Sequence, residues 1–584
     1  METESLGQPC RNFQILGIGS FIDPVDGLEK VVLSNFAAGA TGNLILIDPA
    51  SGEGEDIPLP GDSGAWAVLN WRDEKLLIGT CGTYGYLHCL DLASRTWAEP
   101  LRDPDEAYIW NLCIGSDGLV YGGTYPGCVL LRYDPHRHEL QNMGRMSDES
   151  DNLYSHMVYG GVPGHILVSC GTANPHQTLW NIESGQTQSL GPTGAAVRGV
   201  GDGFISLQSG DQAVCYDSAT FERLEQDRSD QLTNPPAPPS RYGGMWVHTP
   251  LASGSWLVNR GQEYYVDDGG HEAPELCPIP AQRPATQILT ITADEAGNIW
   301  GAAGFGQTIF RHEPDTRTSW NSQVVTDNSG EVYGMAFAHG RLYLATYSGG
   351  DHVVYDPASE WGQLDNSNPV TLESVSPRLI RPSGKSVVGP DGHVWSGWMA
   401  AYGVYGGGLS KIDVDTHEMS CWYDPVPEQA VMSVAADATS LYFITGGQAN
   451  GLAPKTVAPH FVVWDCTGRI TWQHEFDIGT SLTSVAATGG DYAAIAIGDA
   501  VQFYRPASQR LDRPIPVGAP IRYVASLPDG CIAAFSEDHV WRIVPTTGQV
   551  EDVGDTPGRA NSMAVTAAGV IYLAVGTELV RWVI

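Results

Sequence analysis

Hydrophobic and polar positions repeat along the whole chain with a period of about 45 residues. Each repeat begins with a run of small apolar residues and continues, after a turn that is often Asp-Gly, with a run rich in Val, Ile, Tyr and Trp. A Gly-rich loop, a third run that ends near Asp-Pro and a polar fourth run complete it, as in 116–135 and 339–357. Four antiparallel strands at this spacing predict an all-β protein built of β-propeller blades.

Thirteen repeats are recognisable. They begin near residues 12, 62, 106, 152, 194, 241, 286, 331, 382, 431, 480, 519 and 558. The last repeat has room for about three strands, so we expect an N-terminal strand to complete it and close a ring. One propeller usually has about four to eight blades. The sequence therefore predicts two propellers, with six blades in 1–285 and about seven in 286–584.

A proline-rich segment, NPPAPPSRYGG at 234–244, interrupts the repeat pattern. Proline cannot donate a hydrogen bond within a central strand, and it stiffens an extended path. The segment is interpreted as an extended connection between blades or as a loop over the mouth of a ring.

The loop between the second and third strands of a blade lies on the same face as the start of the first strand, around the mouth of the central channel. We predict that polar and aromatic residues at these positions bind substrate: Tyr84, Tyr108, Trp110, Tyr125, Asn174, His176, Tyr242, Tyr333 and Tyr347, with Tyr402 and Tyr405 in similar loops. The alternative is a structural role, because tyrosine is common in strands and glycine is common in turns.

Three further residues are candidates for catalysis. Tyr154 and His156 lie two positions apart, so a strand would present both on one face, as two proton-transfer groups. Arg241 precedes a predicted inner strand and would supply the positive charge that an anionic substrate needs. The alternative for His156 is a hydrogen-bonded core residue.

The composition excludes several classes of partner. Asp and Glu number 67 against 31 Lys and Arg, a formal charge of -36, which repels nucleic acid and anionic membranes. We expect a small-molecule or oligosaccharide substrate, and a protein partner is possible. The eleven cysteines lie mostly in apolar runs without CxxC spacing, and no export signal is visible. These features favour a reduced, cytoplasmic protein, or a secreted one if a leader has been removed.

Motifs for metal and nucleotide chemistry are absent. The chain has no HExxH, no GxSxG and no GxGxxG between a strand and a helix. His136 and His138 are interpreted as part of a solvated turn. We expect no cofactor and no metal site, although a divalent cation stays an open alternative.

The blade pattern DGLVYGGTYPGCVLLRYDP at 117–135 resembles the broad superfamily of repeat propellers, which includes lactonase-like proteins, the virginiamycin B lyase type and propeller polysaccharide lyases. The lyase resemblance implies β-elimination at a uronic acid, with His or Tyr as base and acid, and Arg or a cation neutralising the carboxylate. Lactonase-like members bind a divalent metal through acidic and Asn ligands, a set that we cannot match here.

Three functions are compatible with these features. The favoured one is an enzyme that acts on a small polar, carbohydrate or uronate-like substrate by acid/base elimination. The alternatives are a non-catalytic propeller that binds proteins and another small-molecule enzyme, such as a hydrolase or cyclase of specialised metabolism, because a propeller fold does not determine function.

Overall fold

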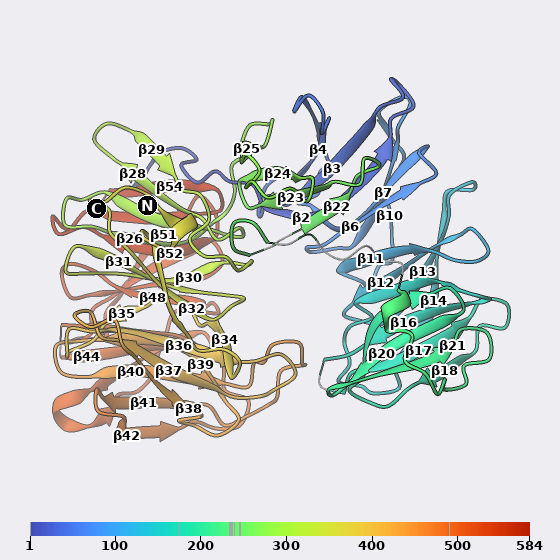
Figure 1. Cartoon of the computed structure of the whole chain (residues 1–584). Helices are drawn as coiled ribbons and strands as arrows, with labels where there is room; N and C mark the ends of the chain where they lie inside the picture. Colours follow the sequence, from blue (N-terminus) through green and yellow to red (C-terminus); the bar gives the residue numbers. More distant parts are fainter. Residues whose placement is uncertain are drawn as a thin grey trace. The chain divides into compact units, whose positions relative to one another are not determined.

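The computed structural model describes residues 2–172, 174–232, 238, 240–244, 247–489 and 491–583. Within them the chain forms thirteen antiparallel sheets, most of them four-stranded (Figure 1). The helical segments of the described residues are three-residue 3-10 turns at Ser229–Gln231, Gln363–Asp365 and Pro506–Ser508. The predicted all-β architecture of tandem blades is therefore confirmed. Residues 234–237 and 239 of the proline-rich segment lie outside the described residues.

The chain divides into two compact units. The six-bladed unit comprises Phe13–Gln282 and Gly451–Ala453, and the seven-bladed unit comprises Met1–Asn12, Arg283–Asn450 and Pro454–Ile584. The first twelve residues thus belong with the later repeats and not with those that follow them directly. The six-bladed unit is inserted after the first strand of the seven-bladed unit.

The inner strands of the six-bladed unit are the first strands of successive repeats. They are β2 (Ile15–Ile22), β6 (Ala65–Trp71), β11 (Tyr108–Ile114), β15 (Met157–Val162), β19 (Ala196–Gly201) and β22 (Val247–Pro250). Each of the first four packs beside the next in chain order, and β22 packs beside β2. This order places the starts of β6, β11 and β15 in three adjacent blades.

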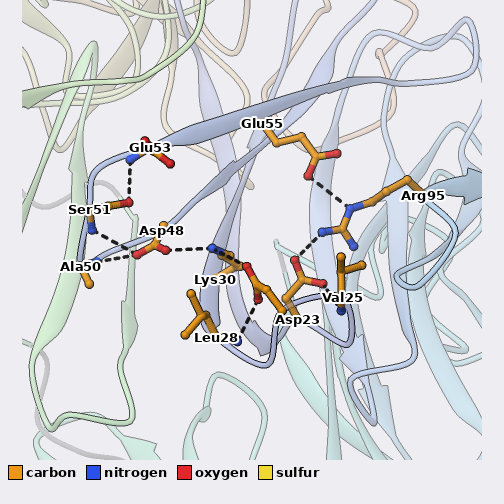
Figure 2. Close-up of polar contacts among 11 residues, drawn as sticks. Asp23, Val25, Leu28, Lys30, Asp48, Ala50, Ser51, Glu53, Glu55 and Arg95 are labelled. Atoms are coloured by element: carbon orange, nitrogen blue, oxygen red, sulfur yellow. Dashed lines mark hydrogen bonds and ion pairs between the residues drawn. The ribbon is translucent and has the colours of Figure 1, made fainter.

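Ion pairs connect the first two blades of the six-bladed unit at their rims (Figure 2). Lys30 Nζ lies 2.9 Å from Asp48 and 3.1 Å from Asp26, all within the first blade. Arg95, from the second blade, pairs with Asp23 and lies 3.2 Å from Glu55. A hydrogen bond from Lys30 lowers the pKa of Asp48. Arg95 therefore links the rim of the second blade to that of the first.

The inner strands of the seven-bladed unit also follow chain order. They are β26 (Ile288–Ala293), β30 (Val332–Ala338), the pair β34 (Leu379–Pro382) and β35 (Val387–Val388), β39 (Ala430–Ala436), β43 (Leu482–Thr488), β48 (Tyr523–Ser526) and β52 (Ala560–Val565). The strands β34 and β35 both pair with β36 (Val394–Ala400) and so share the inner position of one blade. The first inner strand, β26, packs against the last, β52, which closes the ring.

Both ends of the chain enter one sheet of the seven-bladed unit. The strand β1 (Glu2–Ser5) pairs antiparallel with β54 (Glu578–Val583), with Thr3 opposite Trp582. Figure 1 accordingly marks the two termini close together. The N-terminal strand supplies the outermost strand that the last repeat lacks, which satisfies the backbone groups of an otherwise open sheet edge.

Side-chain hydroxyls link neighbouring inner strands of the seven-bladed unit. The ladder shifts register before Ser433, Ser484 and Ser562, each of which is the third or fourth residue of its inner strand. Their Oγ atoms accept hydrogen bonds from the backbone N–H groups of the next blade, namely Val485, Val524 and Ile291. Small polar residues therefore recur near the starts of inner strands, where a bulge turns the side chain toward the neighbouring blade.

The hydrophobic core lies between neighbouring sheets. A typical cluster joins Trp300 in one blade to Val332 and Leu344 in the next. Outermost strands are polar and exposed, as in β14 (Glu139–Arg145) and β42 (Arg469–Glu475). All eleven cysteines are free, and seven of them are buried. Among the described residues, no helix is long and apolar enough to span a membrane.

Candidate functional site

Five residues from two adjacent blades meet at the mouth of the seven-bladed unit. This mouth cluster consists of Glu331, Tyr333, Tyr347, Arg381 and Tyr402. Glu331 and Tyr333 lie at the start of β30, and Arg381 lies on β34. Tyr347 and Tyr402 occupy the loops that follow the second strands of the same two blades. Inner-strand starts and these loops therefore share one face, as expected for propeller blades.

Arg381 is the centre of the mouth cluster. Its Nη1 donates a hydrogen bond to the Tyr333 hydroxyl at 2.6 Å, and its Nε donates to the Asn450 Oδ1 at 2.8 Å. The guanidinium lies 3.8 Å from the centroid of the Tyr347 ring, over its face. The hydroxyl of Tyr402 is 2.7 Å from that of Tyr347 and 3.5 Å from Arg381 Nη2. These contacts fix the orientation of the guanidinium, and no carboxylate among the described residues lies within salt-bridge distance of it.

Glu331 supplies a titratable carboxyl group beside this arginine. Its side chain is buried, and its Oε2 has no hydrogen-bond partner among the described residues. Burial raises the pKa of Glu331 to about 7, although the Arg381 charge and the Tyr333 hydroxyl oppose the shift. Burial also raises the pKa of Tyr333 far above its usual value. At neutral pH, Tyr333 is thus a proton donor and Glu331 exchanges a proton readily.

A cavity of about 440 Å³ occupies the centre of the seven-bladed ring. It is lined by residues from all seven blades, and Tyr333 contributes both to its wall and to the mouth cluster. The cavity is of the size that small-molecule sites have. Its charged lining residues are Lys385 and Arg522.

Aromatic residues gather in three adjacent blades of the six-bladed unit. This aromatic cluster consists of Trp66, Tyr108, Trp110, Tyr125 and Tyr154, with neighbouring ring centroids 4.7–5.8 Å apart. All five side chains are partly exposed. Three of them are predicted substrate-binding residues and Tyr154 is a predicted catalytic residue, and the structure brings these four together.

His156 follows Tyr154 of the aromatic cluster by two positions in the chain and directly precedes β15. Burial lowers its pKa, so the imidazole is neutral at pH 7. Its Nδ1 is buried and has no hydrogen-bond partner among the described residues. The segment of Tyr154 and His156 is not part of β15, so a shared strand face does not describe their arrangement.

Arg241 is engaged elsewhere. Its Nε and Nη2 donate hydrogen bonds to the Asp267 carboxylate at 2.7 and 3.0 Å, and Nη2 also donates to the Gly270 carbonyl. The neighbouring Tyr242 donates to the Pro274 carbonyl and packs edge-on against Tyr265. Among the contacts between described residues, none joins Arg241 to Tyr154 or His156. A bidentate carboxylate already neutralises this guanidinium.

The remaining predicted residues are dispersed. Tyr84 is exposed, and the Arg102 guanidinium lies over its ring, 4.0 Å from the ring centroid. The backbone carbonyl of Asn174 lies 3.1 Å from the His176 Nδ1, at the start of β17 (His176–Asn181). Tyr405 stacks against Lys455. None of these contacts links them to the mouth cluster or the aromatic cluster within the part of the chain that the structure describes.

Sequence reasoning missed Glu331, Arg381 and Trp66. Arg381 could have been found from its position, because it lies in the first part of an inner strand, and Arg241 was chosen for its position near the start of a predicted inner strand. Glu331 carried no distinguishing signal among 67 acidic residues. Among the described residues, no group of three or more His, Cys, Asp or Glu side chains could hold a metal ion.

Comparisons with known proteins concern the fold. No family model matches the chain, and no curated protein matches it in sequence. A catalytically inactive variant of virginiamycin B lyase from Staphylococcus aureus, solved with quinupristin, is 12% identical, with a TM-score of 0.40, over 51% of this chain and 94% of that one. The extracellular domain of BT3049 from B. thetaiotaomicron, described as a hybrid two component system, is 13% identical, with a TM-score of 0.38, over 96% of this chain and 74% of that domain. The corresponding domain of BT4673 is 12% identical, with a TM-score of 0.28, over 98% of this chain and 83% of that domain. The β-propeller architecture of this chain is read from its own thirteen sheets.

Proposed function

We propose that the seven-bladed unit is an enzyme that acts on a small polar substrate with a carboxylate, such as a uronate-containing sugar, by acid/base β-elimination at the mouth cluster. The observation that carries the proposal is the environment of Arg381. Its guanidinium is held by Tyr333 and Tyr347 beside a buried carboxyl group whose pKa is about 7. A fixed cation next to proton-transfer groups is what elimination next to a carboxylate requires.

Arg381 binds the substrate carboxylate in this scheme. A protein with a formal charge of -36 repels anions on average, so local positive charge must overcome that field. The planar guanidinium suits a carboxylate because it can donate two parallel hydrogen bonds. The same charge stabilises the enolate that forms when the neighbouring proton leaves.

Proton removal runs through Tyr333 and Glu331. The raised pKa of Tyr333 disfavours a free tyrosinate, so Tyr333 passes its proton to the Glu331 carboxylate as it accepts the proton of the substrate carbon. The C–H electron pair becomes the new C=C bond, and the C–O bond to the leaving group breaks. The Tyr402 hydroxyl, which is exposed and hydrogen-bonded to Tyr347, protonates the departing oxygen.

The test is a screen of uronate-containing oligosaccharides with the full chain. Elimination produces an unsaturated uronate, whose new ultraviolet absorbance is followed directly. We expect the signal for at least one uronate polymer and none for its carboxyl-reduced form, in which Arg381 has no anion to bind. Absence of the signal from every uronate tested, with the protein folded, would reject the proposal.

A further inference from the structure

The inner strand of one blade in the seven-bladed unit is interrupted where it borders the channel. The strand β34 ends at Pro382 and β35 begins at Val387. Between them Gly384 has a φ of 92°, a conformation that other residues adopt only with strain. The interruption places Lys385 in the wall of the channel.

Lys385 contacts a backbone carbonyl at this position. Its Nζ donates a hydrogen bond to the backbone carbonyl of Met563, on the inner strand β52 of another blade. None of the ion pairs among the described residues includes Lys385. Burial lowers the pKa of Lys385 to about 8, so the amine is still mostly charged at neutral pH. A buried ammonium with only a carbonyl partner retains uncompensated charge.

Arg522 is the second cation of the channel wall. Its Nε lies 3.3 Å from Glu537, whose side chain is 65% exposed and also lies 3.8 Å from Arg559. The exposed carboxylate of Glu537 is therefore shared between Arg522 and Arg559. The Arg522 Nη1 is buried without a hydrogen-bond partner among the described residues.

The channel wall differs in charge from the rest of the protein. Of the described residues that line it, Lys385 and Arg522 are cationic and none is Asp or Glu, whereas the whole chain carries a formal charge of -36. Thr290 and Ser383 add hydroxyl groups that have no partner among the described residues. Two cations and free hydroxyl donors in a cavity of about 440 Å³ form a suitable site for a compact anion.

We propose that this channel binds a small oxyanion, a carboxylate or a phosphate, through Lys385 and Arg522. The site is separate from the Arg381 guanidinium and does not depend on the elimination reaction. Its ligand neutralises charge that the protein leaves unpaired, and the hydroxyls of Thr290 and Ser383 provide further donors. Binding is measurable without turnover.

Calorimetric titration of the full chain tests the site, with phosphate in one arm and malonate in the other, at ionic strength held constant with sodium chloride. We expect one of the two anions to bind with a stoichiometry of one. Lys385→Met and Arg522→Gln should each weaken that binding about tenfold or more, the cost of losing a hydrogen bond to a charged group. Arg510→Gln, which removes an exposed arginine from the same unit, and Arg381→Gln should leave it unchanged.

Failure of both anions to bind would overturn the proposal, as would equal weakening by Arg510→Gln. Loss of binding in Arg381→Gln alone would assign the anion to the mouth cluster and would also overturn it. If a channel variant does not fold, the site is tested instead by trace acetylation of lysines in the wild-type chain. Saturating anion should then protect Lys385 and not Lys411, which pairs with Asp391 away from the channel. Equal labelling of Lys385 with and without the anion contradicts the site.

Discussion

The guanidinium of Arg381 donates a hydrogen bond of 2.6 Å to the hydroxyl of Tyr333, and this contact joins the inner strands of two adjacent blades. Propeller packing brings such residues together although 48 positions separate them in the chain. The tyrosine also borders the central cavity. The pair therefore lies between the mouth cluster and the central cavity.

Replacement of Arg381 tests its role at the mouth cluster. Arg381→Ala should lower kcat/KM for a uronate substrate about a hundredfold to a thousandfold, the usual cost of losing one preorganised group that stabilises developing negative charge. Arg381→Lys should recover only part of the loss, because an ammonium cannot donate the parallel pair of hydrogen bonds. Steady-state kinetics with Arg510→Gln as the matched control measures this. Wild-type kinetics in Arg381→Ala would remove the arginine from the mechanism.

The pH dependence of turnover tests Glu331. The carboxylate must be ionised to accept the proton from Tyr333, and its pKa is about 7. We therefore expect kcat/KM to fall as the pH drops below about 7 and to level off above it. In Glu331→Gln this limb should vanish together with most of the activity. An unchanged profile in that variant would exclude Glu331 as the proton acceptor.

The same residue makes stability depend on pH. Burial raises the pKa of Glu331 from its ordinary value of 4.5 to about 7 in the folded protein, so the unfolded chain loses this proton first as the pH rises. The folded state is therefore destabilised progressively between about pH 4.5 and 7, by at most about 3 kcal/mol. Denaturant unfolding at several pH values should show Glu331→Gln gaining stability relative to wild type across this window. A pH-independent difference would contradict the raised pKa.

His156→Ala distinguishes the two units as sites of catalysis. If elimination occurs at the mouth cluster, this variant should keep its turnover. If His156 is the base, as the sequence suggested, turnover should fall by about two to four orders of magnitude with folding intact. Kinetics and thermal unfolding on the same purified variant separate these outcomes, and the large loss would move the catalytic site to the six-bladed unit.

Removal of β1 tests ring closure. Deletion of residues 2–5 leaves β54 as an exposed edge and removes the backbone hydrogen bonds of the β1–β54 pairing. We expect a lower Tm and a greater tendency to aggregate, because unpaired edges add further strands. Thr3→Ala, which keeps the backbone pairing, is the control. Equal Tm values for the deletion and wild type would show that the ring does not need this strand.

Repeats and strand order were accessible to sequence reasoning because they follow from local chemistry. Runs such as that of 116–135 alternate turn residues with β-branched and aromatic residues, and each sheet except the one that β1 completes is formed within one repeat. The grouping of Tyr108, Trp110, Tyr125 and Tyr154 also follows from blade geometry. Arg241 shows the limit of this reasoning. Its position predicted an available cation, but Asp267, from a later strand of the same blade, pairs with it.

The sequence alone determined the all-β class, the thirteen repeats and the face on which aromatic loops gather, because strand periodicity and turn chemistry act over a few residues. Only the tertiary structure decided which charges remain unpaired. Contacts between strands or blades determine the partners of Arg241 and Arg381 and the burial that raises the pKa of Glu331. They also place Lys385 and Arg522 in a channel wall that has no Asp or Glu among the described residues. Ion pairing and desolvation depend on distances of a few ångströms between groups that are far apart in the chain, and no local pattern encodes those distances.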